Sequence, residues 1–461
     1  DGRTFEVLDP ATGRPIATVA DGGALDATAA VDAAHDAFAV WSAMPSRARS
    51  EVLSRAHALM IEDIDTIAAV ISAENGKPLA DSKAEIVYAA EFFRWFSEEA
   101  VRTEGGFGEA PAGGARTIVA SQPVGVAALV TPWNFPAAMI TRKIAPALAA
   151  GCTVVLKPAG ETPLTAFVIA RILERAGVPD GVVNIVATRR STDVVSAWLS
   201  DARVRKLSFT GSTGVGRVLL AQAAEHVVNT SMELGGNAPF VVGPDADVDK
   251  AVAGAMHAKF RNGGQVCTAA NRFYVHADAA EKFIPAFGAA VEALQVGNGF
   301  DEGTTIGPMI TADAVRKIAA LVDAALAAGA RVAYRAEPSS EPGNFYPPTI
   351  LVDIPADADI LHSEIFGPVA PIVIWSNDDE LVDLVNDSEY GLASYVYSRD
   401  LQWALKLAER IESGMVGVNV GLISDPAAPF GGVKQSGIGR EGGREGLREF
   451  QEVRYFRVDW T

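Results

Sequence analysis

The sequence predicts an α/β protein in which a mainly parallel sheet is flanked by helices. In the middle of the chain, short apolar segments alternate with helical patterns, and this order favours parallel strand pairing. A second α/β unit begins near Pro239. The 461 residues, of which 49% are hydrophobic, are too many for one simple core, so we expect two or three domains.

Helical patterns dominate the N-terminal part. Apolar residues recur there at spacings of 4, 3, 4 and 3, at Ala27, Val31, Ala34, Phe38 and Trp41. The pattern stays mostly helical to about Ser97. It ends at a glycine-rich break over residues 105–114, and a short β-like segment follows at 117–120.

The central part contains the strands that we expect to carry a binding site. The strand candidates are residues 124–130, 153–157, 182–186 and 204–209. A helix is predicted between Thr162, a suitable N-cap that is followed by Pro163, and Gly177. Ligands bind beyond the carboxyl ends of parallel strands, and both Lys157 and the Thr210-Gly211 turn follow such ends.

The C-terminal part continues the α/β pattern. A helix is predicted to begin after Thr311 and to end near Gly329, and residues 371–375 are a strand candidate. The last strand candidate covers residues 452–458. A terminal strand of this kind can pair with a partner subunit or close a sheet of its own chain, and the sequence leaves both open.

Composition argues against several classes of function. The net charge of −18 disfavours nucleic-acid binding, which needs clustered Lys and Arg. No run of about 18 apolar residues predicts a membrane span. The six histidines are scattered without HExxH spacing, so we expect no metal site. Two cysteines without a CxxC pair, and the lack of a secretory signal pattern, favour the cytoplasm.

Cys267 is a candidate nucleophile. It follows Gly263-Gly264-Gln265-Val266, and adjacent glycines favour a sharp turn or a close approach to a ligand. A thiolate attacks an aldehyde carbon readily. An isolated cysteine is, however, more often a small buried apolar residue. Cys152 leads directly into an apolar strand, and we interpret it as structural.

Three further segments are weak indicators on their own. Glu233, which precedes Leu234 and two glycines, could be a general base with room to move or a solvent-facing turn residue. Residues 210–216 could bind a phosphate at a helix N-terminus or form an ordinary strand-to-helix turn. The side-chain amide of Asn134 could bind an oxyanion, although Asn is also common in turns.

Taken together and in this order, the motifs resemble the aldehyde dehydrogenase superfamily over nearly the whole chain. The segments that carry the resemblance are residues 131–136, 157–158, 209–216, 233–236, 264–267, 364–368 and 429–432. The resemblance implies an aldehyde dehydrogenase-like α/β fold with a Rossmann-type cofactor domain, an α/β catalytic domain and a small β bridging element for oligomerisation. The implied boundaries are 1–104 with 123–234, then 235–440, and 105–122 with 441–461. A homodimer or a homotetramer is also implied.

The same resemblance implies the catalytic roles. Cys267 would attack the aldehyde carbon to give a thiohemiacetal, while Asn134 and the backbone N–H of Cys267 would hold the oxyanion. Transfer of hydride to a nicotinamide would leave a thioester, and Glu233 would activate the water that hydrolyses it. Lys143 and Glu441 match further family positions that support proton movement.

The resemblance also implies a binding site for NADP or NAD. Lys157 would bind the adenosine ribose, with Gly160 beside it. Trp133 and Ser212 would lie near the pyrophosphate. Glu364 would hold the nicotinamide ribose, and Phe366 would pack nearby. The predicted cofactor-binding set is completed by Gly211, Gly216 and Leu234.

Four segments, at 131–143, 207–213, 233–240 and 259–262, look like those of succinate-semialdehyde dehydrogenases. In that subfamily two arginines and a serine hold the substrate carboxylate, and the matching residues are Arg142, Arg261 and Ser424. Guanidinium groups bind carboxylates in a bidentate manner, although both arginines could instead form structural ion pairs. The resemblance therefore implies an aldehyde with a carboxylate tail, with succinic semialdehyde as the substrate and glutarate semialdehyde or a neutral aldehyde as alternatives.

Two other interpretations are disfavoured. A CoA-acylating relative, which passes the thioester to a thiol, tends to lack the general base that Glu233 would provide. A non-catalytic protein on this fold would have no reason to keep Cys267, Glu233, Asn134 and Lys157 together.

Two positions depart from patterns within the subfamily. Some members carry a second cysteine two residues after the nucleophile, but this chain has Ala269 there, so that no disulfide switch can form at that place. NAD-preferring relatives carry a Glu three residues after the lysine that matches Lys157. Here that position is Gly160, and the acid is displaced to Glu161. Loss of this negative charge favours NADP, unless Glu161 turns toward the ribose.

Overall fold

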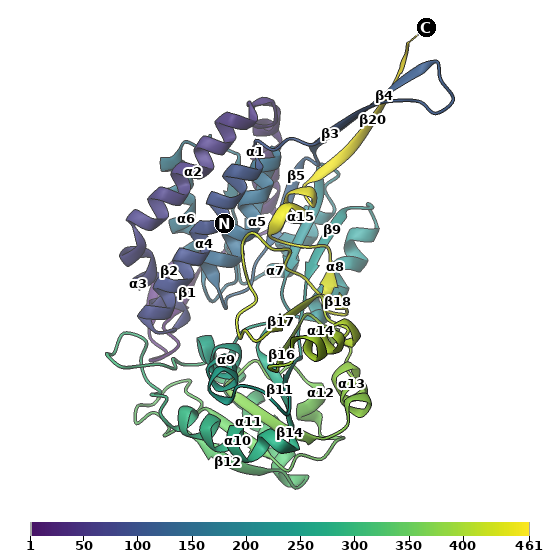
Figure 1. Ribbon diagram of the computed structural model, residues 1–461. Coiled ribbons are helices and arrows are strands. Elements are labelled where there is room, and N and C mark those ends of the chain that lie inside the picture. The colour runs from purple at the N-terminus through teal and green to yellow at the C-terminus, as the bar shows by residue number, and fades with distance from the viewer. Residues whose placement is uncertain (1, 461) are drawn as a thin grey trace.

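The computed structural model describes residues 2–460. Over these residues the chain forms a body, which contains two large sheets with their helices, and an arm that projects from the body (Figure 1). At the N-terminus, β1 (Thr4–Leu8) and β2 (Pro15–Ala20) form an antiparallel pair. The sequence did not predict this pair, because each of the two strands buries only one residue and shows no clear alternation.

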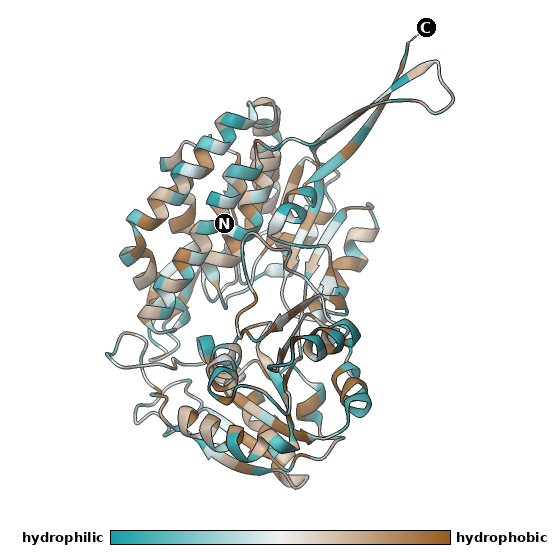
Figure 2. Cartoon of the chain, viewed as in Figure 1, coloured by the Kyte–Doolittle hydropathy of each residue, from teal (hydrophilic) through white to brown (hydrophobic). Residues whose placement is uncertain are grey.

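Four helices follow and cover one side of the body. They are α1 (Ala24–Ala43), α2 (Ser46–Glu62), α3 (Ile64–Asn75) and α4 (Leu79–Glu99). The predicted apolar face of α1 is buried at Ala27, Val31, Ala34 and Trp41, whereas Phe38 is half-buried. Figure 2 shows that these helices carry both hydrophobic and hydrophilic residues along their length, as amphipathic helices on a core do.

The first large sheet has the strand order β19-β9-β8-β5-β6-β7 among the described residues. Its strands are β5 (Val126–Val130), β6 (Thr153–Lys157), β7 (Val183–Ile185), β8 (Val204–Thr210), β9 (Asn229–Glu233) and β19 (Gly437–Ile438). All pairs are parallel except that of β19 with β9. The helices between them are α5 (Pro136–Ala150), α6 (Pro163–Ala176), α7 (Ser191–Leu199) and α8 (Thr213–Ala224). The predicted parallel sheet is therefore confirmed.

The second large sheet has the order β12-β13-β14-β11-β10-β16-β17 in the part of the chain that the structure describes. Its strands are β10 (Ala238–Val242), β11 (Ala270–His276), β12 (Arg331–Arg335), β13 (Thr349–Val352), β14 (Val369–Trp375), β16 (Ala393–Tyr397) and β17 (Met415–Val418). Only the pairing of β12 with β13 is antiparallel among its described pairs. The accompanying helices are α9 (Val248–Phe260), the 3-10 turn η1 (Arg261–Gly264), α10 (Ala277–Glu292), α11 (Ala312–Ala327), α12 (Asp359–His362), α13 (Asp378–Asn386) and α14 (Leu401–Arg410).

The remaining elements join the sheets and form the arm. A short pair, β15 (Tyr390–Gly391) and β18 (Val433–Lys434), and the helix α15 (Gly443–Arg448) belong to the body. The arm consists of β3 (Gly105–Glu109), β4 (Ala115–Pro123) and β20 (Gln451–Asp459), in the order β20-β4-β3. The glycine-rich segment is thus partly a strand and not only a break. The last strand pairs with β4 of its own chain along its whole length.

Thr162 and Thr311 were both predicted to cap a helix, but only one of the two side chains makes a capping hydrogen bond. Thr162 occupies the N-cap position of α6, but its side chain makes no capping hydrogen bond, while Gly177 ends the helix with a left-handed φ of 96°. Thr311 caps α11 by accepting a hydrogen bond from the Ala314 N–H at 3.2 Å. No helix within residues 2–460 is long and apolar enough to cross a bilayer.

Candidate active site

The carboxyl ends of the first sheet bring the predicted residues to one edge. β5 leads into the loop that carries Trp133 and Asn134, β6 ends at Lys157, and β9 ends at Glu233. Because these strands are parallel, their ends lie at the same edge of the sheet. The loop from η1 to β11, which carries Cys267, belongs to the second sheet's half of the chain.

Asn134 presents its amide from a buried loop. The residue is 4% exposed, and its Nδ2 donates to the backbone carbonyl of Gln265 at 3.0 Å. This bond uses one of the two N–H groups of the amide and leaves the other for an oxyanion. The bond also connects Asn134 to the segment that immediately precedes Cys267.

The segment before Cys267 turns sharply. Asn262, Gly263 and Gly264 have positive φ angles of 49°, 63° and 75°. A Cβ on Gly264 would lie 2.3 Å from the carbonyl oxygen of Gly367, which no real side chain could tolerate. The predicted turn and close approach are therefore both present, although the approach is to another loop of the protein.

Cys267 lies half-buried in the wall of a cavity of about 810 Å³. Burial raises the pKa of its thiol to about 12, with Arg142 and Arg261 acting in the opposite direction and Glu233 adding to the rise. The resting group is therefore a protonated thiol. Attack on a carbonyl carbon requires that this proton be removed.

The sequence suggested that the glycines after Glu233 give its carboxylate room to move. In the structure these glycines allow backbone segments to pack closely. A Cβ on Gly236 would lie 2.2 Å from the carbonyl oxygen of Cys267, and one on Gly235 would lie 2.9 Å from Oε2 of Glu364. The Gly236 N–H donates to Oε1 of Glu364 at 3.0 Å. The glycine pair thus lets the β9–β10 connection pack directly against Cys267 and Glu364.

Glu233 and Glu441 form a pair of carboxylates with opposite environments. Glu233 is 3% exposed, and neither of its oxygens has a hydrogen-bond partner among the described residues. Burial raises the pKa of Glu233 well above its usual value, and the negative Glu441 raises it further. A carboxylate with a raised pKa is a stronger base once it is ionised, which suits a group that takes a proton from water. The predicted solvent-facing alternative for Glu233 is wrong.

Glu441 is held ionised by two cations. Lys143 Nζ pairs with Oε1 of Glu441 and donates to Ser208 Oγ at 3.0 Å, while Arg142 Nε lies 2.6 Å from Oε2 of Glu441. Burial opposes ionisation, but Lys143 and Arg142 together hold the pKa of Glu441 below its usual value. Lys143 and Glu441 are therefore a buried ion pair beside Glu233.

The three predicted carboxylate-binding residues meet around a tyrosine. Burial raises the pKa of Tyr88, on α4, while Arg142, Arg261 and Ser424 all act to lower it, so the three residues lie close to its hydroxyl. Arg142 is 1% exposed and stacks over Phe430 at 4.1 Å, in addition to its ion pair with Glu441. For Arg142 the structural ion pair that the sequence left open is present.

Arg261 differs from Arg142 in its partners. It makes no salt bridge with any residue between 2 and 460, and its buried Nε has no hydrogen-bond partner there. Its guanidinium group lies 5.1 Å from the Phe135 ring. Arg261 is half-buried, and a guanidinium group that makes no direct ion pair is available to bind an anionic ligand.

A long cleft fits the predicted dinucleotide. The cavity at Cys267 shares Pro132, Trp133, Glu161, Thr210, Gly211 and Ser212 with a second cavity of about 630 Å³. Ser212 is the N-cap of α8, where backbone N–H groups favour a phosphate. At the Cys267 end the cavity is lined by Leu234, Glu364 and Phe366. Phe366 has a positive φ of 49°, and its ring lies edge-on to Trp133 with centroids 5.4 Å apart.

The other end of the cleft carries positive charge. Lys157 and Gly160 line it together with Arg189, which sequence reasoning did not identify. Burial lowers the pKa of Lys157 to about 8, and its Nζ donates to the Pro158 carbonyl at 2.9 Å. Arg189 lies 3.4 Å from Glu161, so the displaced acid has a cation beside it. Gly216 does not line either cavity; it allows α8 to pack on Leu234, where a Cβ would be only 2.4 Å away.

The structure also shows what surrounds Cys152 and Ala269. Cys152 is fully buried, its Sγ lies 3.3 Å from the carbonyl oxygen of Phe450, and burial raises its pKa to about 11. It is a packed core residue, in keeping with its structural interpretation. Ala269 is buried beside the Cys267 turn and offers no thiol there.

Sequence reasoning missed Tyr88, Arg189 and the buried pair of Lys77 and Glu85. One signal was present for Glu85, because it shares a helical spacing with the buried Ala89, Phe92 and Phe96, and an acid on an apolar face is unusual. Arg189 follows a three-residue strand in an irregular loop, and no local pattern marks it.

Comparison with known proteins agrees with this geometry. The family model described as "Aldehyde dehydrogenase family" matches residues 1–456. A succinate-semialdehyde dehydrogenase of Paenarthrobacter nicotinovorans is 51% identical over 96% of this chain and 98% of its own length. A glutarate-semialdehyde dehydrogenase of Pseudomonas aeruginosa is 47% identical over 99% of this chain and 94% of its own. A crystal structure described as an E. coli NADP-dependent enzyme superposes with a TM-score of 0.98 at 46% identity, covering 99% of this chain and 95% of that one.

Proposed function

The chain belongs to the aldehyde dehydrogenase family, and from this premise we propose that it oxidises succinic semialdehyde to succinate with NADP or NAD. The observation that supports this substrate is Arg261, a half-buried cation near Cys267 that makes no salt bridge with any residue between 2 and 460. Relatives named for succinic and glutaric semialdehydes share 51% and 47% of their residues with it.

The first half of the reaction uses Cys267 and Asn134. The Cys267 thiol gives its proton to water in the cavity, its sulfur forms a bond to the aldehyde carbon, and the electron pair of the C=O double bond moves to oxygen to give the thiohemiacetal anion. The free N–H of the Asn134 amide, with the backbone N–H of Cys267, donates to the oxygen that becomes negative. When bound, the nicotinamide cofactor supplies the oxidant that accepts hydride from this carbon.

The second half uses Glu233. A thioester on Cys267 remains, and it must be hydrolysed before the next cycle. Glu233, ionised above its raised pKa, takes a proton from the water that attacks the thioester carbon. The buried pair of Lys143 and Glu441 lies beside Glu233 and can receive or return that proton.

The cofactor residues fit a dinucleotide that spans the cleft. Glu364 lines the end near Cys267, while Lys157, with Gly160 and Arg189, lines the other end. Ser212 at the start of α8 and Trp133 lie where the two cavities meet, so the pyrophosphate would sit at the helix N-terminus.

Replacement of Arg261 by Gln is the sharpest test of the substrate. We expect KM for succinic semialdehyde to rise about ten- to hundred-fold, because a charge-assisted bidentate contact is lost. KM for butanal, which has the same carbon chain without the carboxylate, should change little. Steady-state kinetics with both aldehydes measure this difference, and equal effects on both would contradict a carboxylate pocket.

Arg142 is a less specific target than Arg261. Because Arg142 also pairs with Glu441, its removal alters the charge beside Glu233 and should slow the oxidation of every aldehyde. Ser424 contributes a neutral hydroxyl near the same place, and its replacement by Ala should have a smaller effect on KM than that of Arg261. Glutarate semialdehyde, one carbon longer, is the second candidate substrate, and the ratio of kcat/KM between the two acids decides between them.

We propose NADP as the preferred cofactor. Gly160 leaves the ribose end of the cleft without the acid of NAD-preferring relatives, Glu161 is offset by Arg189, and Arg189 lines the same cavity. A 2′-phosphate would meet Lys157 and Arg189 there, and both are suited to phosphate.

Replacement of Gly160 by Glu should change this preference. We expect the ratio of kcat/KM for NADP to that for NAD to fall about ten- to hundred-fold, because the new carboxylate repels the 2′-phosphate. Gly160→Ala is the matched control, since it adds the same Cβ, which would lie 3.1 Å from Cδ of Arg189, without the charge. A similar fall in the Ala variant would show that space, and not charge, sets the preference.

We also propose that the chain forms a homodimer or a homotetramer and works in the cytoplasm. The arm exposes apolar side chains at Phe107, Val453, Tyr455 and Trp460, and its edge strands β20 and β3 have unpaired sides. Both cysteines are free thiols, which suits a reducing compartment. Light scattering would test the assembly, and the mass of a single chain would contradict it.

A further inference from the structure

A buried ion pair lies behind the loop that carries Asn134. Lys77 stands between α3 and α4, and Glu85 lies on α4; they are 2% and 3% exposed. Lys77 Nζ lies 2.5 Å from Oε2 of Glu85 and 4.1 Å from the centre of the Phe135 ring. A buried ion pair adds little net stability compared with apolar residues of the same volume, so its presence calls for another explanation.

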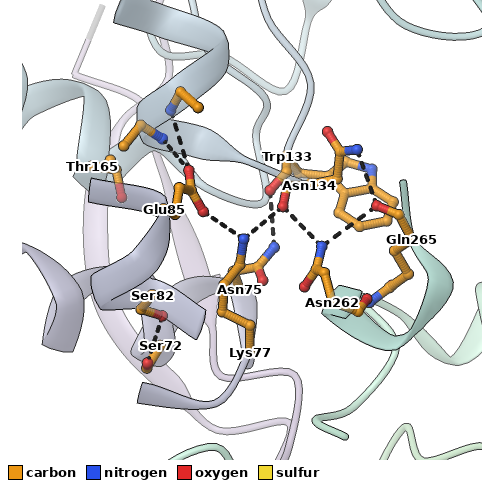
Figure 3. Close-up of polar contacts among 12 residues, drawn as sticks. Ser72, Asn75, Lys77, Ser82, Glu85, Trp133, Asn134, Thr165, Asn262 and Gln265 are labelled. Carbon is orange, nitrogen blue, oxygen red and sulfur yellow. Dashed lines mark hydrogen bonds and ion pairs between the residues drawn. The ribbon is translucent and has the colours of Figure 1, made fainter. Parts of the chain in front are cut away.

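The pair and its neighbour Asn75 hold the backbone of the Asn134 loop at successive points (Figure 3). Lys77 Nζ donates to the carbonyl oxygen of Asn134 at 2.8 Å. The Asn75 side chain donates to the carbonyl oxygen of Trp133 at 2.9 Å. Glu85 Oε1 accepts from the N–H groups of Ala137 and Ala138, at 2.8 and 3.2 Å, which fixes the first turn of α5.

The backbone carbonyl group of Asn134, which accepts from Lys77, also binds the loop that precedes Cys267. Asn262 Nδ2 donates to the Asn134 oxygen at 2.9 Å, so that this oxygen accepts from Lys77 and from the nucleophile loop together. In return, the Asn134 amide donates to the Gln265 carbonyl at 3.0 Å. Figure 3 shows these residues as one continuous set of contacts between the two halves of the chain. The position of the Asn134 amide relative to Cys267 therefore depends on the place at which Lys77 holds its backbone.

We propose that Lys77, supported by Glu85, is a positioning residue for the oxyanion-binding amide of Asn134. It does not touch the reacting atoms. Its ammonium group fixes the Asn134 peptide, so that the free N–H of the side chain points to the oxygen of the thiohemiacetal. An error of about 1 Å in such a donor can reduce the rate by about a hundred-fold. The proposal rests on the role of Asn134 in the proposed function.

The test compares Lys77→Met with Asn134→Ala and the double variant. We expect Lys77→Met to lower kcat about ten- to hundred-fold with KM for the cofactor nearly unchanged, and Asn134→Ala to lower kcat about a hundred- to thousand-fold. Because Lys77 acts through Asn134, the double variant should be no slower than Asn134→Ala alone. Lys77→Arg, which keeps the charge and the donors, should recover part of the rate.

Arg49→Met is the matched control. Arg49 is also a buried cation that donates to backbone carbonyl groups, including that of Ala149 at 3.2 Å, but it holds the opposite end of α5. This variant should lose stability without a comparable loss in kcat. A thermal scan of each variant shows that it is folded, and Lys77→Gln replaces Lys77→Met if the latter is not.

The outcomes separate this proposal from the proposed function. If the losses of Lys77→Met and Asn134→Ala multiply in the double variant, Lys77 acts independently of Asn134 and the positioning role is wrong. If Asn134→Ala itself keeps full activity, the oxyanion role of Asn134 is wrong, and the result contradicts the proposed function. The aldehyde used is the one that the unmodified enzyme turns over best, so a wrong substrate assignment does not affect the comparison.

Discussion

The Glu233→Gln variant should form about one equivalent of reduced cofactor per active site in a rapid burst and then turn over at least about a hundred-fold more slowly. In the proposed mechanism, formation of the thiohemiacetal and its oxidation need Cys267 and Asn134, and both remain. Hydrolysis of the thioester needs a base that removes a proton from water, and an amide cannot do so. Rapid mixing with detection of the reduced nicotinamide measures both phases. A variant that continues at the normal steady-state rate would show that another group is the base.

The pH dependence gives a second measure of the same residue. Burial and the neighbouring Glu441 raise the pKa of Glu233, and the base form is the ionised one. The hydrolytic rate of the unmodified enzyme should therefore rise as the pH increases through this raised pKa, and the Gln variant should lack that rise. In Glu441→Gln the rise should move to lower pH, because a negative charge beside Glu233 has been removed. An unchanged profile in Glu441→Gln would contradict the coupling of the two carboxylates.

The sequence was most informative where a pattern is repeated along one element. The strands β6, β8 and β14 and the helices α1, α6 and α11 could be predicted because their apolar spacing is regular and their ends carry Gly, Pro or Thr. The strands β1, β2 and β3 escaped prediction because they are mostly exposed and their side chains do not alternate between core and solvent.

The candidate site residues followed from motifs, but their interactions did not. Residues 131–136 and 233–236 identified Asn134 and Glu233, whereas the contact of Gly236 with the Cys267 carbonyl appears only in three dimensions. Arg142 and Arg261 looked equivalent in the sequence. The structure separates them, because Arg142 pairs directly with Glu441, whereas Arg261 makes no salt bridge with any residue between 2 and 460. Such differences depend on contacts with residues that are far away in the sequence. Local spacing gives no information about these contacts.

Replacement of Cys267 by Ala should have the largest effect of any single substitution. The dehydrogenase activity should fall by more than about a thousand-fold, or about 4 kcal/mol in the activation barrier, because the proposed covalent intermediate forms on this thiol. Cofactor binding, measured by calorimetry, should remain, since the cleft residues are unchanged. Cys152→Ala is the matched control: it removes the other thiol, which is fully buried, and should lower stability without loss of turnover.

Alkylation distinguishes the two thiols directly. Cys267 is half-buried in the cavity wall and Cys152 is 0% exposed, so iodoacetamide should label Cys267 alone in the folded enzyme, as read by mass spectrometry. Because burial raises the pKa of the Cys267 thiol to about 12, the labelling rate should still be rising with pH at alkaline values. Arg261→Gln removes a positive charge that lowers this pKa, and should therefore slow labelling at a fixed pH, whereas Glu233→Gln removes a negative charge and should accelerate it. If neither substitution changes the labelling rate, the charges of Arg261 and Glu233 do not set the reactivity of the Cys267 thiol.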